Sequence, residues 1–306
     1  MSSPALFTTT AVSTWLTTAV YPRVLHVFER VCNLVDGERR VLSLVAPEIG
    51  RGPFSLVVAL GNGRFPDFIQ ADSPVYLQPS ELRLRVGALA LETRAAELWQ
   101  ARPFWETVPA SARQTYLPLF ESKLAAFSPD SMAHLNGHFD RLGDGRSEAI
   151  AQKAQTAIQL LQQGLESDDL AACQEGARGL AGLGVGLTPA GDDFLLGVIY
   201  SLWLTEESSG KGAQAHRIIE VMAEAAERRT TTLSAAWLRA AARGEAGEPW
   251  HELAAALRDS GETTTSTRSA SAVSQAIERI LATGHTSGAD ALAGFVFTAK
   301  NVMCDG

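Results

Sequence analysis

The sequence has few cysteines, and they are not spaced as a disulfide framework or a structural zinc site would require. Cys32, Cys173 and Cys304 are odd in number and widely separated, and no Cys-x-x-Cys or Cys/His zinc pattern occurs among the 306 residues. Disulfide frameworks and structural zinc sites both need closely spaced ligands. We therefore predict three reduced thiols, and we expect no metal and no cofactor.

The sequence also lacks a long apolar run and a basic N-terminal segment. No stretch reaches 18 apolar residues, the first basic residue is Arg23, and residues 11–20 contain three threonines and a serine. A secretory leader needs an early positive charge and a bilayer span needs about 20 apolar residues. We expect a cytoplasmic protein with no membrane partner.

Basic clusters are absent as well. The net charge is −8 and no block rich in Lys and Arg appears, so nucleic acid is not expected as a partner. Apolar residues make up 46% and charged residues 20%, which is typical of a soluble globular enzyme. The length permits one large domain or two smaller ones.

The first part of the chain favours β-structure and the rest favours helices. Short β-rich runs recur about every ten residues up to Val86, and Asp36-Gly37 is a hairpin signal. Residues 93–101, 110–127 and 147–164 favour helices, and residues 128–145 are loop-rich, typical of a boundary or a lid. We predict an α+β fold, with a β-rich domain (a small barrel or sandwich) over residues 1–92 and a mainly helical domain over residues 93–306.

Two segments of the helical part share one pattern. Residues 186–197 read GLTPAGDDFLLG and residues 284–294 read GHTSGADALAG. Each has Gly-x-Thr, one or two small residues, Gly-x-Asp, and an apolar run closed by glycine. Each predicts a tight loop that leads into a buried helix, where backbone amides attract anions. We expect the two loops to meet in one composite polar site within the helical domain.

The candidate catalytic residues are Asp192, Asp193 and His285. Neighbouring residues at a helix start point about 100° apart, so one aspartate can contact a ligand while the other caps the helix. For His285 both a binding or orienting role and a general-base role remain open.

The candidate substrate-binding residues are glycines, hydroxyl residues and two further polar side chains near the motifs or beside a strand. The run Arg228-Arg229-Thr230-Thr231-Thr232 could line an oxyanion pocket, or it could provide a helix N-cap at Thr232 or Ser234. The candidates are Gly186, Thr188, Gly191, Thr231, Ser234, Thr286, Ser287, Gly288, Asp290 and Asn33.

The strings GLGVGLTPAGDDFLLG, RTTTLSAAWLRAAARGE and GHTSGADALAG together resemble the AllH subunit family of oxamate carbamoyltransferase, formerly a domain of unknown function. The order and approximate spacing of all three motifs match, and the likeness is specific in the C-terminal half. The family usually has serine where this chain has Ala190.

The resemblance implies an activity and partners. Phosphate would cleave oxalurate, which is N-carbamoyl-oxamate, into oxamate and carbamoyl phosphate during anaerobic allantoin and purine breakdown. The resemblance also implies a hetero-oligomer with FdrA-like and other subunits. Two alternatives stay open: a noncatalytic anion-binding or assembly subunit, and a stand-alone amide hydrolase.

Overall fold

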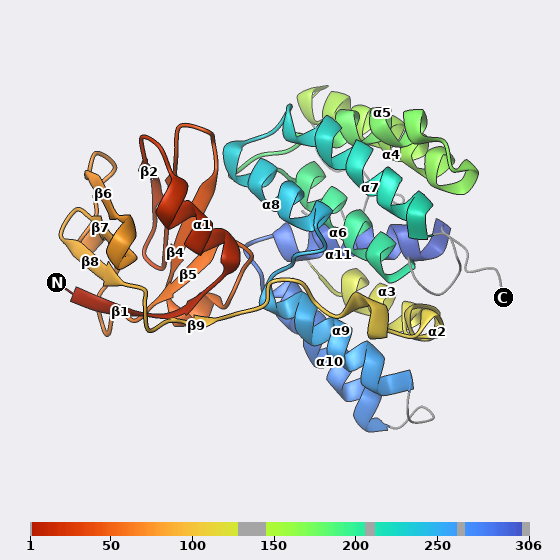
Figure 1. Ribbon diagram of the computed structural model, residues 1–306. Helices are drawn as coiled ribbons and strands as arrows, with labels where there is room; N and C mark the ends of the chain where they lie inside the picture. The colour runs from red at the N-terminus through yellow and green to blue at the C-terminus, as the bar shows by residue number, and fades with distance from the viewer. Residues whose placement is uncertain (1, 128–144, 206–211, 262–266, 302–306) are drawn as a thin grey trace. The chain divides into compact units, whose positions relative to one another are not determined.

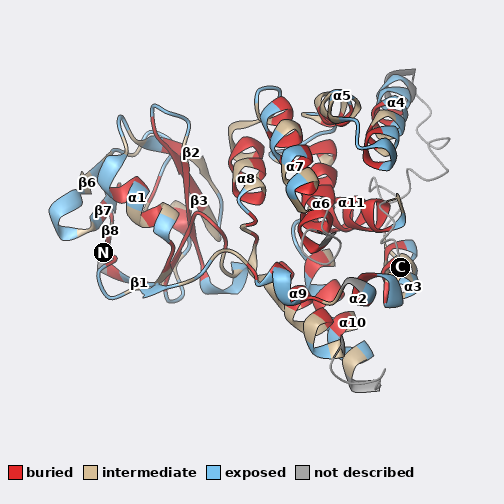
Figure 2. Ribbon diagram, turned by 45° about the vertical axis from the view of Figure 1, so that its right-hand side comes forward, coloured by how far each residue is buried: buried red, intermediate tan, exposed pale blue. Residues whose placement is uncertain are grey.

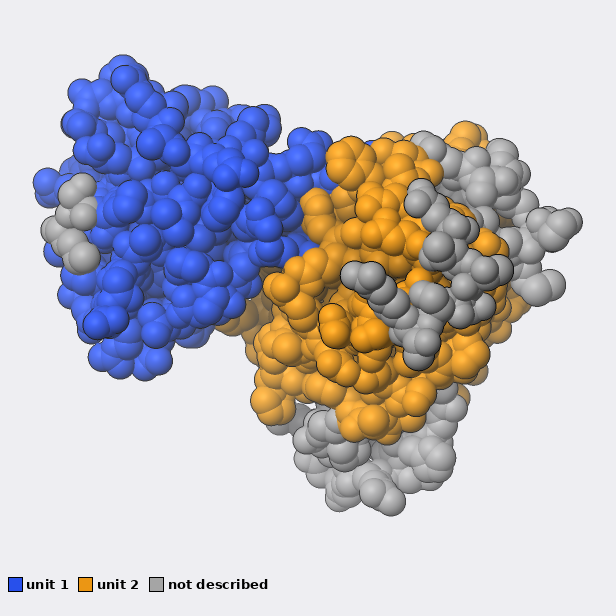
Figure 3. Space-filling model, turned by 90° about the horizontal axis from the view of Figure 1, so that it is seen from below, with its two compact units in different colours: residues 1–102, 245–248 blue, residues 103–244, 249–306 orange. Residues whose placement is uncertain are grey.

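The computed structural model describes residues 2–127, 145–205, 212–261 and 267–301. The chain divides into two compact units, coloured separately in Figure 3. Unit 1 consists of residues 1–102 and 245–248, and unit 2 consists of residues 103–244 and 249–306. The loop predicted over residues 128–145 lies almost entirely outside the described residues.

Unit 1 is a nine-stranded sheet that curls into a nearly closed barrel. Its strands follow the order β2-β3-β4-β5-β1-β8-β7-β6, and β9 pairs with β1. The strands are β1 (Ser2–Thr8), β2 (Arg23–Val27), β3 (Val31–Val35), β4 (Val41–Val45), β5 (Ser55–Val58), β6 (Val75–Gln78), β7 (Arg83–Val86), β8 (Leu89–Glu92) and β9 (Glu97–Leu98).

The core of unit 1 is mainly aliphatic and packs against the helix α1 (Thr10–Thr18), which is red in Figure 1. Leu34, Leu42, Leu44 and Leu56 are each fully buried on β3, β4 and β5. Trp15 of α1 belongs to the same core cluster. Short 3-10 turns connect the strands at Pro47–Ile49, Phe65–Asp67 and Pro79–Glu81.

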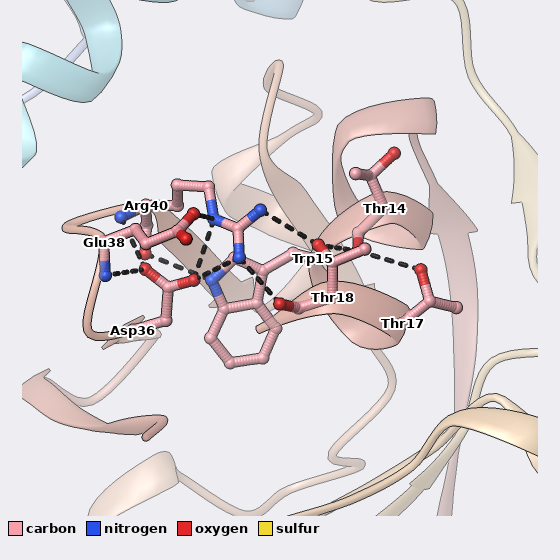
Figure 4. A network of polar contacts seen from close by, with 7 residues as sticks. All are labelled: Thr14, Trp15, Thr17, Thr18, Asp36, Glu38 and Arg40. Atoms are coloured by element: carbon pink, nitrogen blue, oxygen red, sulfur yellow. Dashed lines mark hydrogen bonds and ion pairs between the residues drawn. The ribbon is translucent and has the colours of Figure 1, made fainter. Parts of the chain in front are cut away.

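The predicted Asp36-Gly37 turn joins β3 to β4, and a buried carboxylate organises it (Figure 4). Asp36 Oδ1 accepts the N–H groups of Glu38 (3.0 Å) and Arg40 (2.9 Å), and Oδ2 pairs with the Arg40 guanidinium. Arg40 also donates to the hydroxyl and the carbonyl of Thr18, each at 2.9 Å. The Trp15 indole donates to the Arg40 carbonyl at 3.1 Å. This network fastens α1 to the turn.

We expect Asp36→Ala to lower the free energy of unfolding by about 2–4 kcal/mol, because it leaves the amides of Glu38 and Arg40 without their acceptor and removes the buried partner of the Arg40 guanidinium, which keeps its bonds to Thr18. Glu38→Ala is the control, since Glu38 also pairs with Arg40 but its side chain is 64% exposed. That exposed pair is worth about 0–1 kcal/mol. Urea denaturation measures both, and equal losses would contradict the role given to Asp36.

The helix predicted over residues 93–101 is wrong. Residues Glu97–Leu98 form β9, which runs parallel to β1 with Phe7 opposite Glu97. Trp99 donates its amide to the Thr8 carbonyl at 2.8 Å. Pairing with a strand distant in sequence therefore overrides the local helix propensity of this segment.

Unit 2 is helical. After a 3-10 turn at Trp105–Thr107, its helices are α2 (Ala110–Thr115), α3 (Leu117–Ala125), α4 (Gly145–Ser167), α5 (Leu170–Leu180), α6 (Ala190–Thr205), α7 (Gly212–Glu227), α8 (Thr232–Ala242), α9 (Glu248–Gly261), α10 (Thr267–Leu281) and α11 (Ser287–Asn301). The stripe predicted on α4 is confirmed, because Ala151, Ala154, Ala157, Leu161 and Leu165 are buried and Ile158 is half-buried. Within the described residues, no helix is both long and apolar enough to cross a bilayer.

Helices α6 and α11 form the centre of unit 2 and are buried along most of their length (Figure 2). Their contact is reciprocal. A Cβ on Gly197 of α6 would overlap the Ala291 carbonyl of α11, and a Cβ on Gly294 of α11 would overlap the Phe194 carbonyl of α6. The closing glycine of each sequence motif therefore lets the backbone of the other helix approach, as a local twofold arrangement requires.

Candidate functional site

The first predicted loop joins α5 to α6. Gly182, Gly184 and Gly186 adopt left-handed conformations with φ of 70°, 119° and 99°, so this loop makes turns that other residues disfavour. Gly191 then packs against the Leu180 carbonyl so closely that a Cβ would overlap it. The loop therefore folds back onto the end of α5.

The second loop joins α10 to α11 and repeats this geometry with fewer residues. Gly284 is left-handed (φ 62°), and a Cβ on Gly288 would overlap the Ile280 carbonyl near the end of α10. The Gly288 amide bonds to Thr283 O at 3.0 Å. In the first loop, the Gly191 amide bonds to Leu183 O at 2.9 Å. Helix, loop and helix thus form a structural repeat.

The two loops contact each other, as the sequence predicts. The hydroxyls of Thr188 and Ser287 lie 3.0 Å apart and form a hydrogen bond that joins the two loops. Both residues are half-buried. These hydroxyls come from residues 99 positions apart and define what we call the two-loop site, together with Asp193.

Asp193 lies buried beside the hydroxyl pair, with 4% of its surface exposed. Burial raises its pKa well above the ordinary range, and the nearby carboxyls of Asp290 and Asp192 raise it further. Hydrogen bonds from Ser287 and Thr188 oppose this rise. Its Oδ2 has no hydrogen-bond partner among the described residues. Asp193 is therefore suited to carry a proton in its resting state.

Asp192 has a different environment. Its Oδ1 accepts the Gly182 amide at 2.9 Å, and its Oδ2 accepts the Thr230 hydroxyl. Burial raises the pKa of Asp192, while the bonds from Thr230, Gly182 and Ser234 oppose the rise. Asp192 thus fastens the first loop to the segment before α8. Thr230 is not among the site residues predicted from the sequence, where its only signal is its position in the hydroxyl-rich run.

The remaining hydroxyl residues of the prediction surround the first loop. The N-cap of α8 is Thr231, not Thr232 or Ser234 as considered from the sequence. Its hydroxyl accepts the Ser234 amide at 3.1 Å and donates to Leu187 O at 2.7 Å, so it ties α8 to the first loop. Ser234 is buried beside Asp192.

The second loop places its remaining candidates differently. Asp290 is fully buried close enough to affect Asp193, while Thr286 is half-buried and its carbonyl accepts the Asp290 amide at 2.9 Å. His285 is exposed in the turn before α11.

Asn33 belongs to unit 1. It is buried on β3, where its side-chain oxygen accepts the hydroxyl of Ser43 at 2.6 Å, directly opposite on β4. The structure therefore gives Asn33 a partner within the barrel.

Several backbone amides at the two helix starts are already engaged. The amides of Asp192 and Asp193 bond to Pro189 O at 2.9 and 3.2 Å, and those of Gly191, Gly288 and Asp290 bond to carbonyls within the loops. These five amides are therefore not open to an anion in this conformation. The two-loop site presents hydroxyls and a carboxyl, which are hydrogen-bond donors and acceptors, rather than these amides.

The described residues offer this site neither a reactive thiol nor a cluster of metal ligands. Burial raises the pKa of both Cys32 and Cys173 to about 12, which makes them unreactive thiols. Cys304 lies outside the described residues. No group of three or more His, Cys, Asp or Glu side chains able to hold a metal ion occurs in the part of the chain that the structure describes.

The protein thus has an α+β fold, with a β-barrel unit and a helical unit. In the helical unit, a buried carboxyl lies beside the two paired glycine loops and forms the polar two-loop site with them. Residues 180–299 match the sequence model described as oxamate carbamoyltransferase subunit AllH, and residues 8–98 match that of the AllH family N-terminal domain. The chain belongs to the AllH family. The first match contains both loops and Thr230. No solved structure matches the chain significantly.

Proposed function

We propose that this chain supplies the carbamoyl-binding site for the phosphorolysis of oxalurate, as a subunit of an oxamate carbamoyltransferase in anaerobic allantoin and purine breakdown. The observation that carries this proposal is the buried Oδ2 of Asp193, which has no hydrogen-bond partner in the described part of the chain, beside the Thr188–Ser287 pair. A protonated carboxyl offers one donor and one acceptor, and a carbamoyl or primary amide group offers the complementary acceptor and donor.

The reaction needs a proton at a defined place. Phosphate oxygen attacks the carbamoyl carbon, the bond from that carbon to the oxamate nitrogen breaks, and the nitrogen must gain a proton to leave as oxamate. Hydrogen phosphate loses one proton in the same reaction, so the exchange balances. A carboxyl held neutral by burial serves as the general acid for the leaving nitrogen. The hydroxyls of Thr188 and Ser287 stabilise the oxyanion that develops on the carbamoyl oxygen.

Phosphate, oxalurate, oxamate and carbamoyl phosphate are the small partners implied by this reaction, and FdrA-like and other subunits complete the complex. We place Asp193 in the general-acid role. Asp192, Gly182 and Thr230 hold the first loop in place, and exposed His285 is positioned to contact an incoming substrate.

A binding measurement tests the site without the other subunits. Thr188→Val and Ser287→Ala should each weaken oxamate binding in calorimetry by about tenfold, because each removes a hydrogen bond worth roughly 1 kcal/mol or more. Thr156→Val is the matched control, since the exposed Thr156 hydroxyl donates to Gln152 O of its own helix, α4. Wild-type affinity in both site variants would refute the proposed recognition of oxamate.

One observation favours the alternative of a noncatalytic assembly subunit. Val185 is 92% exposed and Leu187 is 37% exposed in the first loop, where two left-handed glycines flank Val185. An apolar loop tip beside the site suits contact with another subunit. Val185→Asp would then disrupt complex formation in sedimentation while leaving oxamate binding by the isolated chain unchanged.

A further inference from the structure

A second polar hollow lies in unit 2 at the ends of α5 and α7. It has a volume of about 250 Å³. Its lining has the composition of an anion site rather than of an apolar pocket, with three arginines, one glutamine, one glutamate and one alanine. These residues are Gln174, Arg178, Glu224, Ala225, Arg228 and Arg229.

The arginines of this hollow retain most of their binding capacity. Arg228 and Arg229 are exposed, and their side chains have no ion pair or hydrogen bond with any residue that the structure describes. Arg178 pairs with Glu175, which lies outside the lining. Three guanidinium groups against the single carboxylate of Glu224 leave the lining with a positive charge, although the whole chain carries −8.

Helix dipoles account for only part of this arrangement. Arg178 lies in the last turn of α5 and Arg228 follows the end of α7, where cations are favoured by the partial negative charge of the helix end. The two helix ends account for Arg178 and Arg228, one at each end, but they do not account for Arg229 or for Gln174 in the same lining.

The chemistry of the hollow defines its ligand. Guanidinium groups are planar forks that bind phosphoryl oxygens in pairs, and several of them favour a ligand with two or more negative charges. A volume of 250 Å³ falls below the range of about 300–1,000 Å³ typical of drug-sized ligands, so the ligand is compact. We propose that the hollow lined by Arg178, Arg228 and Arg229 binds a small phosphoryl-bearing anion, at a site separate from the two-loop site.

The sequence and contacts link this hollow to the first loop. Arg229 directly precedes Thr230, whose hydroxyl bonds to Asp192. A Cβ on Gly182 would also overlap the Arg229 carbonyl, so the backbone of Arg229 rests against the loop. An anion that orders Arg228 and Arg229 therefore also orders the segment that holds Asp192, without contacting the two-loop site.

Calorimetry on the full chain with pyrophosphate as the probe tests the proposal. The double variant Arg228→Gln/Arg229→Gln should bind at least tenfold more weakly, because it removes two charge-assisted contacts. Glu224→Gln should bind more tightly than the wild type, since it removes the only negative charge of the lining. Arg217→Gln is the matched control, because Arg217 lies on α7 outside the lining and bonds to Gln214.

Two further ligands distinguish a phosphoryl anion from a carboxylate. Inorganic phosphate should compete with pyrophosphate, whereas malonate, a dicarboxylate with the charge of hydrogen phosphate, should bind at least tenfold more weakly than pyrophosphate. Equal binding of malonate and pyrophosphate would overturn the phosphoryl assignment. Unchanged pyrophosphate binding in the double arginine variant, or weaker binding in Glu224→Gln, would overturn the site itself.

Discussion

Asp193→Asn is expected to lower carbamoyl transfer by the reconstituted complex by about 100-fold or more, the usual scale for losing a general acid. Asparagine keeps the size of the side chain and accepts and donates hydrogen bonds, but it has no acidic proton for the leaving nitrogen. The assay follows oxamate-dependent consumption of carbamoyl phosphate. Full activity of this variant would assign the chemistry to another subunit and leave this chain an assembly role.

The same substitution should not destabilise the protein near neutral pH. Because burial raises the pKa of Asp193 in the folded state, the unfolded state ionises first as the pH rises. The folded protein therefore loses stability between the ordinary carboxyl pKa and the raised folded pKa, and this loss is complete above the latter. Asp193→Asn removes this loss. Its melting temperature should equal or exceed that of the wild type, and the difference should grow as the pH rises through that window.

Asp192→Asn is the matched comparison and should behave differently. The oxygen of the introduced carboxamide can still accept the Gly182 amide, but its NH₂ group cannot accept the Thr230 hydroxyl. We expect this variant to lower the melting temperature, through a loosened first loop. Identical stability profiles for the two variants would contradict the separation of their roles.

The second large effect is expected at the crossing of α6 and α11. Gly197→Ala and Gly294→Ala should each lower the free energy of unfolding by about 3 kcal/mol, because the new methyl group overlaps a backbone carbonyl that cannot rotate away. Alanine favours helix by about 1 kcal/mol relative to glycine, so the measured loss understates the cost of the overlap.

The reciprocal geometry gives this prediction a sharper form. Once a single alanine substitution has pushed α6 and α11 apart, the second one meets less overlap. The double variant should therefore lose less free energy of unfolding than the sum of the two single losses. Gly61→Ala is the control: its Cβ meets nothing within 4 Å, but its φ of 60° imposes backbone strain of about 1 kcal/mol. Losses at Gly197 and Gly294 no larger than at Gly61 would show that the helices move apart easily.

The features that the sequence predicts correctly come from local repetition. Alternating apolar runs and Asp36-Gly37 predict the strands and turn of unit 1, and the alanine and leucine stripe predicts α4. The matching glycine motifs predict that the two loops meet, which the Thr188–Ser287 hydrogen bond confirms.

The missed features depend on contacts between distant segments. β1 begins with Ser2-Ser3-Pro4, which has little strand propensity, and it is held by pairing with β5, β8 and β9. The same kind of pairing turns residues 97–98 of the helix-favouring segment 93–101 into strand β9, which follows a turn. The sequence also shows that the side chains of Asp192 and Asp193 point in different directions. Only the positions of Gly182 and Thr230 in the structure show that Asp192 is the one held by hydrogen bonds. Whether the candidate residues bind substrate stays a prediction.

The reciprocal glycine contact has a consequence for how the chain is made. α6 leaves the ribosome with its glycine face bare, and its partner α11 follows about a hundred residues later, on the order of 5–20 s at ordinary synthesis rates. During that interval the face of α6 that carries Gly197 lacks its partner, although all nine barrel strands have already been synthesised. The strands of unit 1 can therefore pair before the central helix pair of unit 2 can form, whereas residues 245–248 join unit 1 only after α6 has been made.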